Sequence, residues 1–421
     1  MYKFVTNIGK DEYETFMKNS NCKHFMQSYD FGQIKKLKNF IPHYVGLKDN
    51  DKIICAALLL EKKLKFGYSY LYSPRGFVID FDNHELVRTF TKEIEKFAKE
   101  KKAVYTKIDP AIKRHTLDQN GNIVSEENNY ETIKFLNSVG FKHLGFNLGF
   151  EHEQPRFTFR IDLTGDWEDI YGRMHPTTRK ILNKGNQYNL HIYKGNSSDI
   201  KDFYTTMIET SKREGIIQSS VEYYKSFFEI FNKDNLSDLY IVKANIKNLI
   251  STFETKINEV CEKISLLQEK ENEKNKNIIN DLNSKLNKLN KDLEEIKSIK
   301  EDEITLSSII TVKYGDTVWT VHGGNNSLLM NLNANYLCYY EIIKGAYNEG
   351  FKTVDCFGTC GIANPDKTNP IYGIHSFKKR LGGEYVEFIG EFDYVNKKFL
   401  YKILPIALKI YRKFKRKEAI K

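Results

Sequence analysis

The sequence predicts a mixed α/β fold with a long helical arm inserted in its second half, and three observations support this. Strand-like apolar runs alternate with amphipathic helix-like runs along most of the chain. The order of these runs is similar before and after residue 150, which predicts two related α/β units. Within the second unit, residues 246–304 carry two narrow apolar stripes with the alternating four- and three-residue spacing of paired helices.

The first unit is predicted to contain four helices and four strands, each supported by its apolar period. Helices are expected at Asp11–Lys18, Ser28–Lys38, Glu85–Lys101 and Tyr130–Val139, and strands at His43–Leu47, Ile53–Leu60, Tyr68–Ser73 and Ala103–Ile108. The polar segment Thr116–Asn129 contains the turn pair Asn120-Gly121, so a loop is expected there.

The second unit is predicted from the same helix-like and strand-like spacing of apolar residues. Helices are expected at Trp167–Leu182, Asp199–Arg213, Val221–Phe231, Asn335–Glu349 and Pro370–Arg380, and strands at Phe157–Ile161, Leu190–Tyr193, Asp238–Ala244, Leu306–Tyr314, Thr317–His322 and Thr353–Phe357. Gly350 directly follows one of these helices, which is a typical signal for a helix end.

The arm consists of two limbs that each have one apolar stripe to bury. The stripes are Phe253, Ile257, Val260, Ile264 and Leu267, then Leu282, Leu286, Leu289, Leu293 and Ile296. They predict an antiparallel coiled coil that reverses at the polar segment 269–277 and projects roughly 35–40 Å. Eleven Lys and thirteen Asp or Glu leave the arm slightly acidic. A contact with a large partner and a spacer or dimerisation stalk are equal interpretations of this pattern.

Composition limits the class of protein. A chain of 421 residues with 40% hydrophobic residues can bury two or three cores and is not disordered. It has neither a run of about 18 apolar residues nor a signal-peptide pattern, so we expect a cytoplasmic protein. The six cysteines are scattered, and the single CxxxC at Cys356 and Cys360 has no second pair, so neither a zinc site nor a disulfide framework is expected.

Positive charge is concentrated at the C-terminus. Residues 397–421 contain ten Lys or Arg and one Glu, which is nearly all of the net charge of +10. Their apolar positions Phe399, Ile403, Ile406, Ile410 and Phe414 have helical spacing, and Pro405 is expected to start or kink the helix. An apolar stripe beside a cationic face predicts contact with an anionic membrane surface; docking of the stripe on the body of the protein is compatible with it.

Polar residues stand at several predicted strand ends, where α/β folds commonly build their sites. The segments are Tyr72–Phe77, Lys107–Pro110, His322–Asn326 and Asp355–Thr359, followed by the helix end Ser376–Gly383. Each segment is a weak signal by itself, so the argument depends on their joint occurrence in this order.

In this order the segments resemble the Fem family of peptidoglycan aminoacyltransferases, over essentially the whole chain. Further matching segments are Phe25–Tyr29, Gln154–Arg156, Thr178–Lys184, Arg213–Gly215 and Gly390–Asp393. The resemblance implies an enzyme that adds bridge amino acids to the stem peptide of a cell-wall precursor, with aminoacyl-tRNA as donor.

The resemblance also implies the domain plan. We expect two acetyltransferase-like (GNAT) subdomains, the first formed by residues 1–150 with residues 393–421 packing back on it, and the second by residues 151–245 and 305–392. The coiled-coil arm, residues 246–304, resembles the arms of some tRNA synthetases and would suit a tRNA partner.

Site residues follow from the resemblance and from the chemistry of acyl transfer. The resemblance places Lys378 at the reacting centre, where its cation would stabilise an oxyanion or the leaving group. Asp109 would either deprotonate the acceptor amine or cap its loop. Because the acceptor carries a diphosphate, Lys36, Arg75, Arg179 and Arg213 are candidates to bind it, and Tyr72, Tyr105, Tyr336 and Phe377 are candidates to line the cleft.

The predicted activity is transfer of an amino acid, with glycine expected by family frequency, to an amine of lipid II or of a soluble UDP-linked precursor. The enzyme is expected to need no cofactor, to work at the inner membrane face and to be a monomer or weak dimer. One alternative is a CoA-dependent N-acyltransferase, although Arg380–Tyr385 departs from the expected pyrophosphate loop at its last position. The other is a non-catalytic membrane adaptor that uses the arm.

Overall fold

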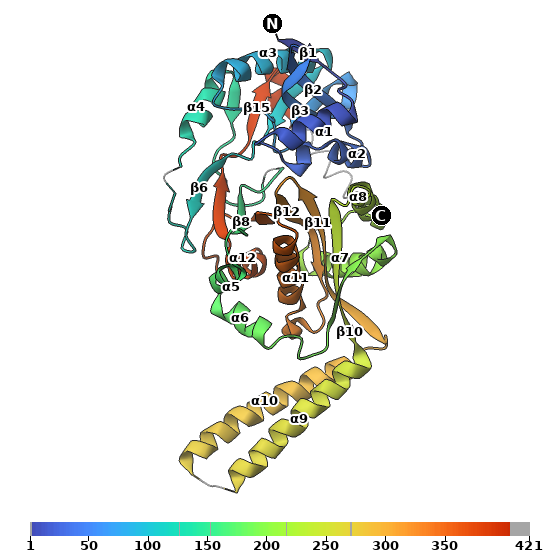
Figure 1. The fold of residues 1–421 in the computed structure, drawn as a ribbon, viewed down its shortest axis with the longest axis vertical. Helices are drawn as coiled ribbons and strands as arrows, with labels where there is room; N and C mark the ends of the chain where they lie inside the picture. Colours follow the sequence, from blue (N-terminus) through green and yellow to red (C-terminus); the bar gives the residue numbers. More distant parts are fainter. Residues whose placement is uncertain (1, 126, 152, 216, 270–271, 405–421) are drawn as a thin grey trace. The chain divides into compact units, whose positions relative to one another are not determined.

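The computed structural model describes residues 2–125, 127–151, 153–215, 217–269 and 272–404 (Figure 1). The chain divides into two compact units. Unit 1 comprises the chain up to Asp162, the short segment Lys313–Thr317 and the chain from Asp355 onward; unit 2 comprises Leu163–Val312 and Val318–Val354. The subdomain boundaries predicted from the sequence stay predictions.

Unit 1 contains a seven-stranded sheet with the order β1-β2-β3-β4-β5-β15-β7. Its strands are β1 (Lys3–Val5), β2 (Ile41–Asp49), β3 (Lys52–Lys63), β4 (Ser69–Ser73), β5 (Ala103–Ile108), β7 (Phe141–His143) and β15 (Phe392–Val395). Neighbouring strands are antiparallel except for β4 and β5, which run parallel. The late strand β15 pairs with β5 and β7, so the chain returns to this sheet after most of its length.

Helices α1 (Lys10–Asn19), α2 (Tyr29–Lys36), α3 (His84–Glu100) and α4 (Tyr130–Ser138) accompany this sheet. The long helix α3 shows why the segment folds this way: Asn83 caps its first turn by accepting the N–H of Leu86 (3.1 Å). Its apolar stripe, which includes Phe90 and Ile94, is buried in one core with Val45 and other sheet residues. A helix with one apolar face needs such a partner surface.

The second sheet has eight strands in the order β6-β14-β8-β13-β12-β11-β10-β9. The strands are β6 (Lys113–Leu117), β8 (Phe157–Asp162), β9 (His191–Gly195), β10 (Ser237–Asn245), β11 (Glu303–Tyr314), β12 (Thr317–Asn325), β13 (Thr353–Thr359) and β14 (Glu384–Phe388). The helices that follow in the chain are α5 (Trp167–Arg173), α6 (Pro176–Asn183), α7 (Ile200–Glu214), α8 (Val221–Asn232), α11 (Ala334–Asn348) and α12 (Tyr372–Lys379). Two sheets with these helices confirm the predicted α/β class.

The arm consists of α9 (Ile246–Gln268) and α10 (Glu273–Lys297), which run side by side in opposite directions within unit 2 (Figure 1). Val260 and Ile264 are buried on α9, and Leu289 and Leu293 on α10, as the two apolar stripes predict. The predicted reversal at 269–277 is wrong in its second half. Helix α10 begins at Glu273 because the side chain of Asn272 caps it, accepting the N–H of Asn275 (2.8 Å).

Two further element predictions are wrong. The predicted helix Trp167–Leu182 is two helices, α5 and α6, because Pro176 starts α6 and cannot continue the preceding helix. Five short strands, β1, β6, β7, β14 and β15, were not expected. They are three to five residues long, and such strands carry too few residues to show a period.

Most of the basic C-terminal segment cannot be compared with its prediction, because residues 405–421 lie outside the described residues. This includes Pro405 and most of the predicted amphipathic stripe. Within the part of the chain that the structure describes, no helix is long and apolar enough to span a membrane.

Candidate functional site

The ends of β4 and β5 in unit 1 bring three predicted site residues together. Because these strands are parallel neighbours, the loops after them start at the same edge of the sheet. There the carboxylate of Asp109 accepts the backbone N–H of Arg75 (2.7 Å) and the hydroxyl of Tyr72 (3.2 Å). Arg75 has a positive φ of 55°, and its Nε lies 4.0 Å from the same carboxylate.

Asp109 is almost completely buried, with 1% of its surface exposed. Burial raises the pKa of this carboxyl to about 7, although the nearby Arg75 opposes the rise. A carboxyl with a pKa in this range can accept a proton and release it near neutral pH, which is the property that a general base requires.

Arg75 extends from this loop to the segment before β8. Its Nη2 donates to the carbonyl oxygen of Pro155 (2.7 Å), and its guanidinium lies 4.6 Å from the ring centre of Phe388. Pro155 in turn packs against Gly358, where an added Cβ would lie only 2.2 Å from the proline Cγ. Gly358 therefore allows a close approach that another residue would block.

Lys378 lies on α12 and is also buried, with 5% of its surface exposed. Its ammonium donates to the carbonyl oxygens of Phe357 (2.9 Å) and Gly358 (2.8 Å). Burial lowers the pKa of Lys378 to about 8. A lysine ammonium has three donors, and these two hydrogen bonds leave one for another acceptor. Pro155 and Gly358 thus connect the Asp109 loop to Lys378.

The Phe357 carbonyl is held in place by Asp355. Phe357 has a positive φ of 57°, which is unfavourable for a bulky residue. The buried carboxylate of Asp355 accepts the N–H of Phe357 (2.8 Å), the hydroxyl of Thr158 (2.6 Å) and Nε of Arg160 (2.9 Å). The surrounding hydrogen bonds therefore maintain a strained backbone beside Lys378, as is common near functional sites.

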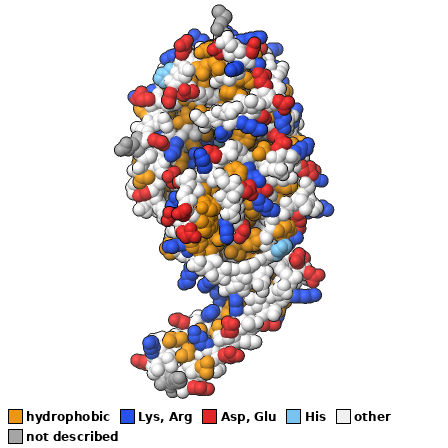
Figure 2. Space-filling view, viewed as in Figure 1, with side chains coloured by type: hydrophobic (Ala, Val, Ile, Leu, Met, Phe, Trp, Pro, Cys, Tyr) orange, Lys and Arg blue, Asp and Glu red, His pale blue; other side chains and the backbone are white. Residues whose placement is uncertain are grey.

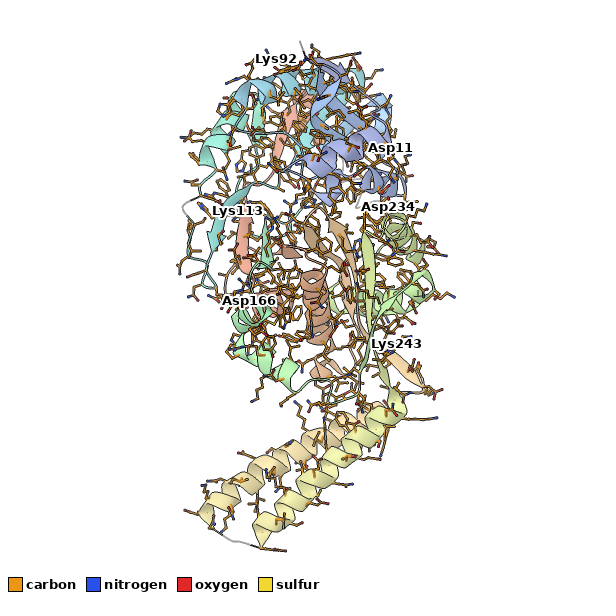
Figure 3. All side chains as sticks on the ribbon, in the orientation of Figure 1. Asp11, Lys92, Lys113, Asp166, Asp234 and Lys243 are labelled. Atoms are coloured by element: carbon orange, nitrogen blue, oxygen red, sulfur yellow. The ribbon has the colours of Figure 1, made fainter. Side chains whose placement is uncertain are left out.

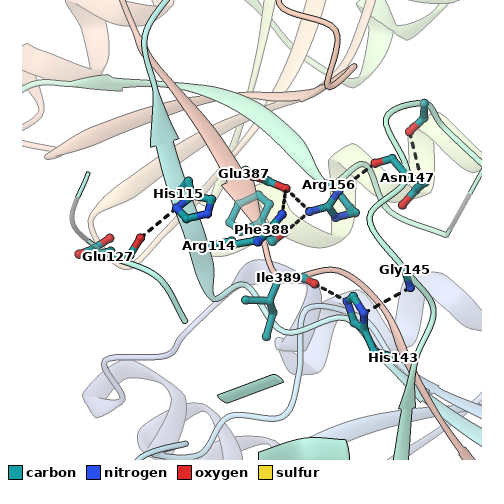
Figure 4. Close-up of polar contacts among 11 residues, drawn as sticks. Arg114, His115, Glu127, His143, Gly145, Asn147, Arg156, Glu387, Phe388 and Ile389 are labelled. Atoms are coloured by element: carbon teal, nitrogen blue, oxygen red, sulfur yellow. Dashed lines mark hydrogen bonds and ion pairs between the residues drawn. The ribbon is translucent and has the colours of Figure 1, made fainter. Parts of the chain in front are cut away.

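A buried ion cluster supports the segment that contains Pro155 (Figure 4). The guanidinium of Arg156 pairs with Glu387 and donates to the carbonyl oxygens of Asn147 (2.9 Å) and Phe388 (3.1 Å). Arg114 contributes a second ion pair to Glu387 (2.8 Å). Because Arg156 directly follows Pro155, this cluster fixes the carbonyl to which Arg75 donates.

The other predicted site residues of unit 1 are Lys36, Tyr105 and Phe377. Lys36 is exposed at the end of α2. Tyr105 on β5 is partly buried and stacks on Tyr70, with ring centres 5.3 Å apart. Phe377 precedes Lys378 on α12 and is partly buried.

Three predicted residues belong to unit 2. Arg179 lies on α6 and lines a pocket of about 410 Å³. Arg213 lies near the end of α7 and forms an ion pair with Glu214 (2.9 Å). Tyr336 is buried on α11. Among the described residues of unit 2, no polar cluster joins Arg179 to Arg213.

Sequence reasoning missed the supporting residues Asp355, Arg156 and Glu387. Asp355 and Arg156 lie in segments that the sequence analysis names, but the sequence pattern assigns no role to either residue. Arg156 and Glu387 are 231 positions apart, so no local pattern could pair them. A buried network of acidic and basic side chains around one lysine on an α/β scaffold is a setting suited to transfer of an acyl group.

The comparisons with known proteins agree with that class. The chain matches the FemAB family over residues 8–409 and belongs to this family. The "Lipid II:glycine glycyltransferase" of Staphylococcus haemolyticus is 27% identical over 98% of this chain and 99% of its own length, and the protein of that name from Staphylococcus epidermidis is 28% identical with the same coverage. A solved structure described as "Crystal structure of FemX" covers 95% of this chain and 99% of its own, with 25% identity and a TM-score of 0.74.

These relatives confirm three predictions: the family, the fold class and an enzyme of the acyltransferase type. The site residues and the subdomain boundaries stay predictions.

Proposed function

We propose that this enzyme transfers glycine from an aminoacyl-tRNA to an amine of the stem peptide or growing bridge of lipid II. Relatives named lipid II:glycine glycyltransferases align with 98% of the chain, which supports glycyl transfer in bridge synthesis. The observation that carries the chemistry is the buried ammonium of Lys378, which is held by two neutral carbonyl groups and retains a donor.

The reaction forms one amide bond and breaks one ester bond. The acceptor amine attacks the ester carbonyl carbon of the glycyl group, and the carbonyl oxygen becomes an oxyanion. Collapse of this intermediate releases the ribose oxygen of the tRNA, which takes up a proton, while the attacking nitrogen loses one. The ester is already activated, so no covalent enzyme intermediate is required.

Lys378 and Asp109 divide this work. The charged ammonium of Lys378 stabilises the oxyanion or the leaving ribose oxygen. Asp109, with its pKa raised to about 7, accepts the proton from the amine. Arg75 acts as a positioning residue, because its backbone holds the Asp109 carboxylate and its side chain holds Pro155.

The acceptor diphosphate requires cations near the acceptor cleft. Lys36 is suited because it is exposed and forms no ion pair among the described residues. Tyr72 and Tyr105 are proposed to line the cleft with Phe377. On unit 2, Arg179 and Arg213 are kept as candidates to bind the acceptor diphosphate, and Tyr336 is kept as a candidate to line the cleft.

The enzyme is proposed to work as a peripheral protein at the inner face of the plasma membrane, as a monomer or weak dimer. The cationic segment 397–421 supports this location, since the acceptor lipid II of the relatives is a membrane-anchored molecule. A CoA-dependent acyltransferase is the runner-up, and calorimetry with acetyl-CoA would detect it. The adaptor alternative predicts no turnover.

Transfer of radiolabelled glycine, alanine and serine from charged tRNA to lipid II tests the proposal, with the soluble UDP-linked precursor in parallel. Glycine transfer to lipid II alone is expected. Transfer to the soluble precursor would keep the chemistry and overturn the membrane location. Intact charged tRNA with no transfer to either acceptor would overturn the proposed function.

A further inference from the structure

A polar pocket of about 190 Å³ lies in unit 2 beside the base of the arm. It is lined by α6, the loop after it and the start of α11, including Lys180, Lys184, Gln187, Tyr188 and Asn331. Figure 2 shows Lys and Arg side chains gathered where the arm leaves the body of unit 2. We refer to this pocket as the arm-base pocket.

The chain segment that supplies most of the lining of the arm-base pocket carries only positive charges. Residues 173–198 contain five Lys or Arg and no Asp or Glu. Lys180 and Lys184 are exposed, and neither forms an ion pair with a described residue. By contrast, Lys243 on β10, which Figure 3 labels, is paired with Asp202 at 2.7 Å. The lysines of the pocket are therefore available to a ligand, while Lys243 is not.

Lys256 of α9 adds a further cation beside the arm-base pocket. Its ammonium is buried and has no hydrogen-bond partner among the described residues, and it lies 3.6 Å from the ring centre of Tyr188, which lines the pocket. Burial, together with the nearby Lys184 and Lys285, lowers the pKa of Lys256 to about 8, although Glu259 opposes the shift. A buried cation without an acceptor is costly unless a ligand supplies one.

One carboxylate of α10 contacts a residue that lines the pocket. Asp292 accepts a hydrogen bond from the side-chain amide of Asn331 (2.6 Å). The remaining lining is rich in amide and hydroxyl groups, from Thr177, Gln187 and Asn333, which bind phosphate and sugar oxygens. Tyr188 adds an aromatic ring of the kind that stacks on nucleic-acid bases.

We propose that the arm-base pocket binds a phosphodiester of the RNA donor through Lys180, Lys184 and Lys256. This inference rests on the proposed function, in which the donor is an aminoacyl-tRNA. The cations continue from α6 to α9 and, with Lys285, to α10, so they form a track from the body of unit 2 onto the arm. A track suits a polymer with repeated phosphates, whereas the diphosphate of the acceptor offers a single anionic group. The slightly acidic composition of the whole arm then matters little, because only its base is used.

Equilibrium binding of the full-length protein to an uncharged glycine tRNA transcript, at several salt concentrations, tests the proposal. The triple variant Lys180→Ser/Lys184→Ser/Lys256→Gln is expected to lower affinity roughly tenfold or more and to reduce the salt slope by about one for each phosphate that it no longer binds. Lys263→Ser is the matched control, because Lys263 is exposed on α9 about 10 Å further along the arm, at 1.5 Å per residue. The control should bind tRNA like the unchanged protein.

Three readouts keep this test separate from the proposed function. If the unchanged protein transfers glycine and the triple variant keeps its tRNA affinity and salt slope, the RNA site is wrong while the function stands. If the variant instead loses affinity for the soluble UDP-linked precursor, the pocket belongs to the acceptor diphosphate and the proposal is overturned. The single variant Lys256→Arg, which keeps the charge, should retain most of the tRNA affinity of the unchanged protein. Equal melting temperatures of the triple variant and the unchanged protein would exclude loss of folding as the cause of weaker binding.

Discussion

The ammonium of Lys378 lies 2.9 Å from the carbonyl oxygen of Phe357, a residue whose backbone is held at a positive φ of 57°. The lysine is thus oriented by a strained stretch of β13 backbone that Asp355 holds by accepting the N–H of Phe357. An ammonium bound by neutral carbonyls in a buried position keeps its direction without being neutralised by a carboxylate. This geometry separates the residue that would touch the reacting atoms from the residues that only position it, and the two kinds can be tested separately.

The variant Lys378→Met should lower kcat of glycyl transfer roughly 100-fold or more, because a preorganised donor to the oxyanion is removed. KM for the acceptor should change little. Steady-state transfer assays with charged tRNA and lipid II measure both constants. Lys379→Met is the control: Lys379 donates to Asn364 (2.8 Å) and not to the Phe357 turn. A near-normal rate for Lys378→Met would remove this lysine from the mechanism.

The variant Asp355→Asn should lower kcat by about tenfold while acceptor KM stays within about twofold, because the Phe357 carbonyl loses a well-placed anchor. The change also weakens a buried charged hydrogen bond to Arg160, which costs about 1–3 kcal/mol of unfolding free energy. Assays well below the melting temperature distinguish the two effects. Full activity in a destabilised protein would show that Asp355 only supports the fold.

The pH dependence of kcat/KM should be bell-shaped. Activity should rise as pH increases through about 7, where Asp109 loses its proton, and fall above about 8, where Lys378 loses its charge. The variant Asp109→Asn should lower the rate and abolish the acidic limb. A profile for this variant with the same acidic limb would exclude Asp109 as the base.

The free energy of unfolding should also depend on pH through the carboxyl group of Asp109, and the direction of this dependence follows from its raised pKa. The folded-state pKa of Asp109 is raised above its ordinary value of 3.8, so folding favours the protonated form. The stabilising contribution of that proton is complete below about pH 4 and is lost as pH rises through about 7. Relative to the unchanged protein, Asp109→Asn should therefore gain on the order of 2 kcal/mol of unfolding free energy between pH 5 and pH 8. Denaturant unfolding at the two pH values measures the difference, and no change would mean that Asp109 is ionised throughout.

The variant Glu387→Gln should destabilise the protein by about 3–5 kcal/mol, because it leaves the guanidinium of Arg156 buried without its counter-ion. Chemical denaturation followed by circular dichroism gives the free energy of unfolding. The matched surface change is Glu131→Gln, which breaks the exposed pair with Lys134 and should leave the free energy of unfolding nearly unchanged. Similar small losses in both variants would contradict the role given to this ion cluster.

Deletion of Tyr411–Lys421 should lower binding to vesicles that contain phosphatidylglycerol roughly tenfold or more, since the deleted segment carries six Lys or Arg and one Glu. Sedimentation with vesicles reports the bound fraction. Vesicles of phosphatidylcholine alone are the control and should bind both proteins weakly. Unchanged binding to the anionic vesicles would overturn the membrane role of this segment.

The sequence by itself determined the features that depend on local patterns. The three- and four-residue spacing of Ile257, Val260 and Ile264 predicted α9 because a helix repeats at short range, and the same holds for the stripe of α3. Lys378 and Asp109 were singled out because several short segments occur along the chain in the same order as in the Fem family. The reversal of the arm was misplaced, because a cap such as Asn272 is a single residue with no period.

Only the tertiary structure decided which of the candidate residues meet. Asp109 and Lys378 are 269 positions apart, and their connection passes through Arg75, Pro155 and Gly358, which come from three separate parts of the chain. Burial also sets the direction of both pKa shifts, and burial is a property of the packed chain. The sequence therefore names the chemical groups, while folding determines which of them touch, their solvent exposure and hence their proton affinity.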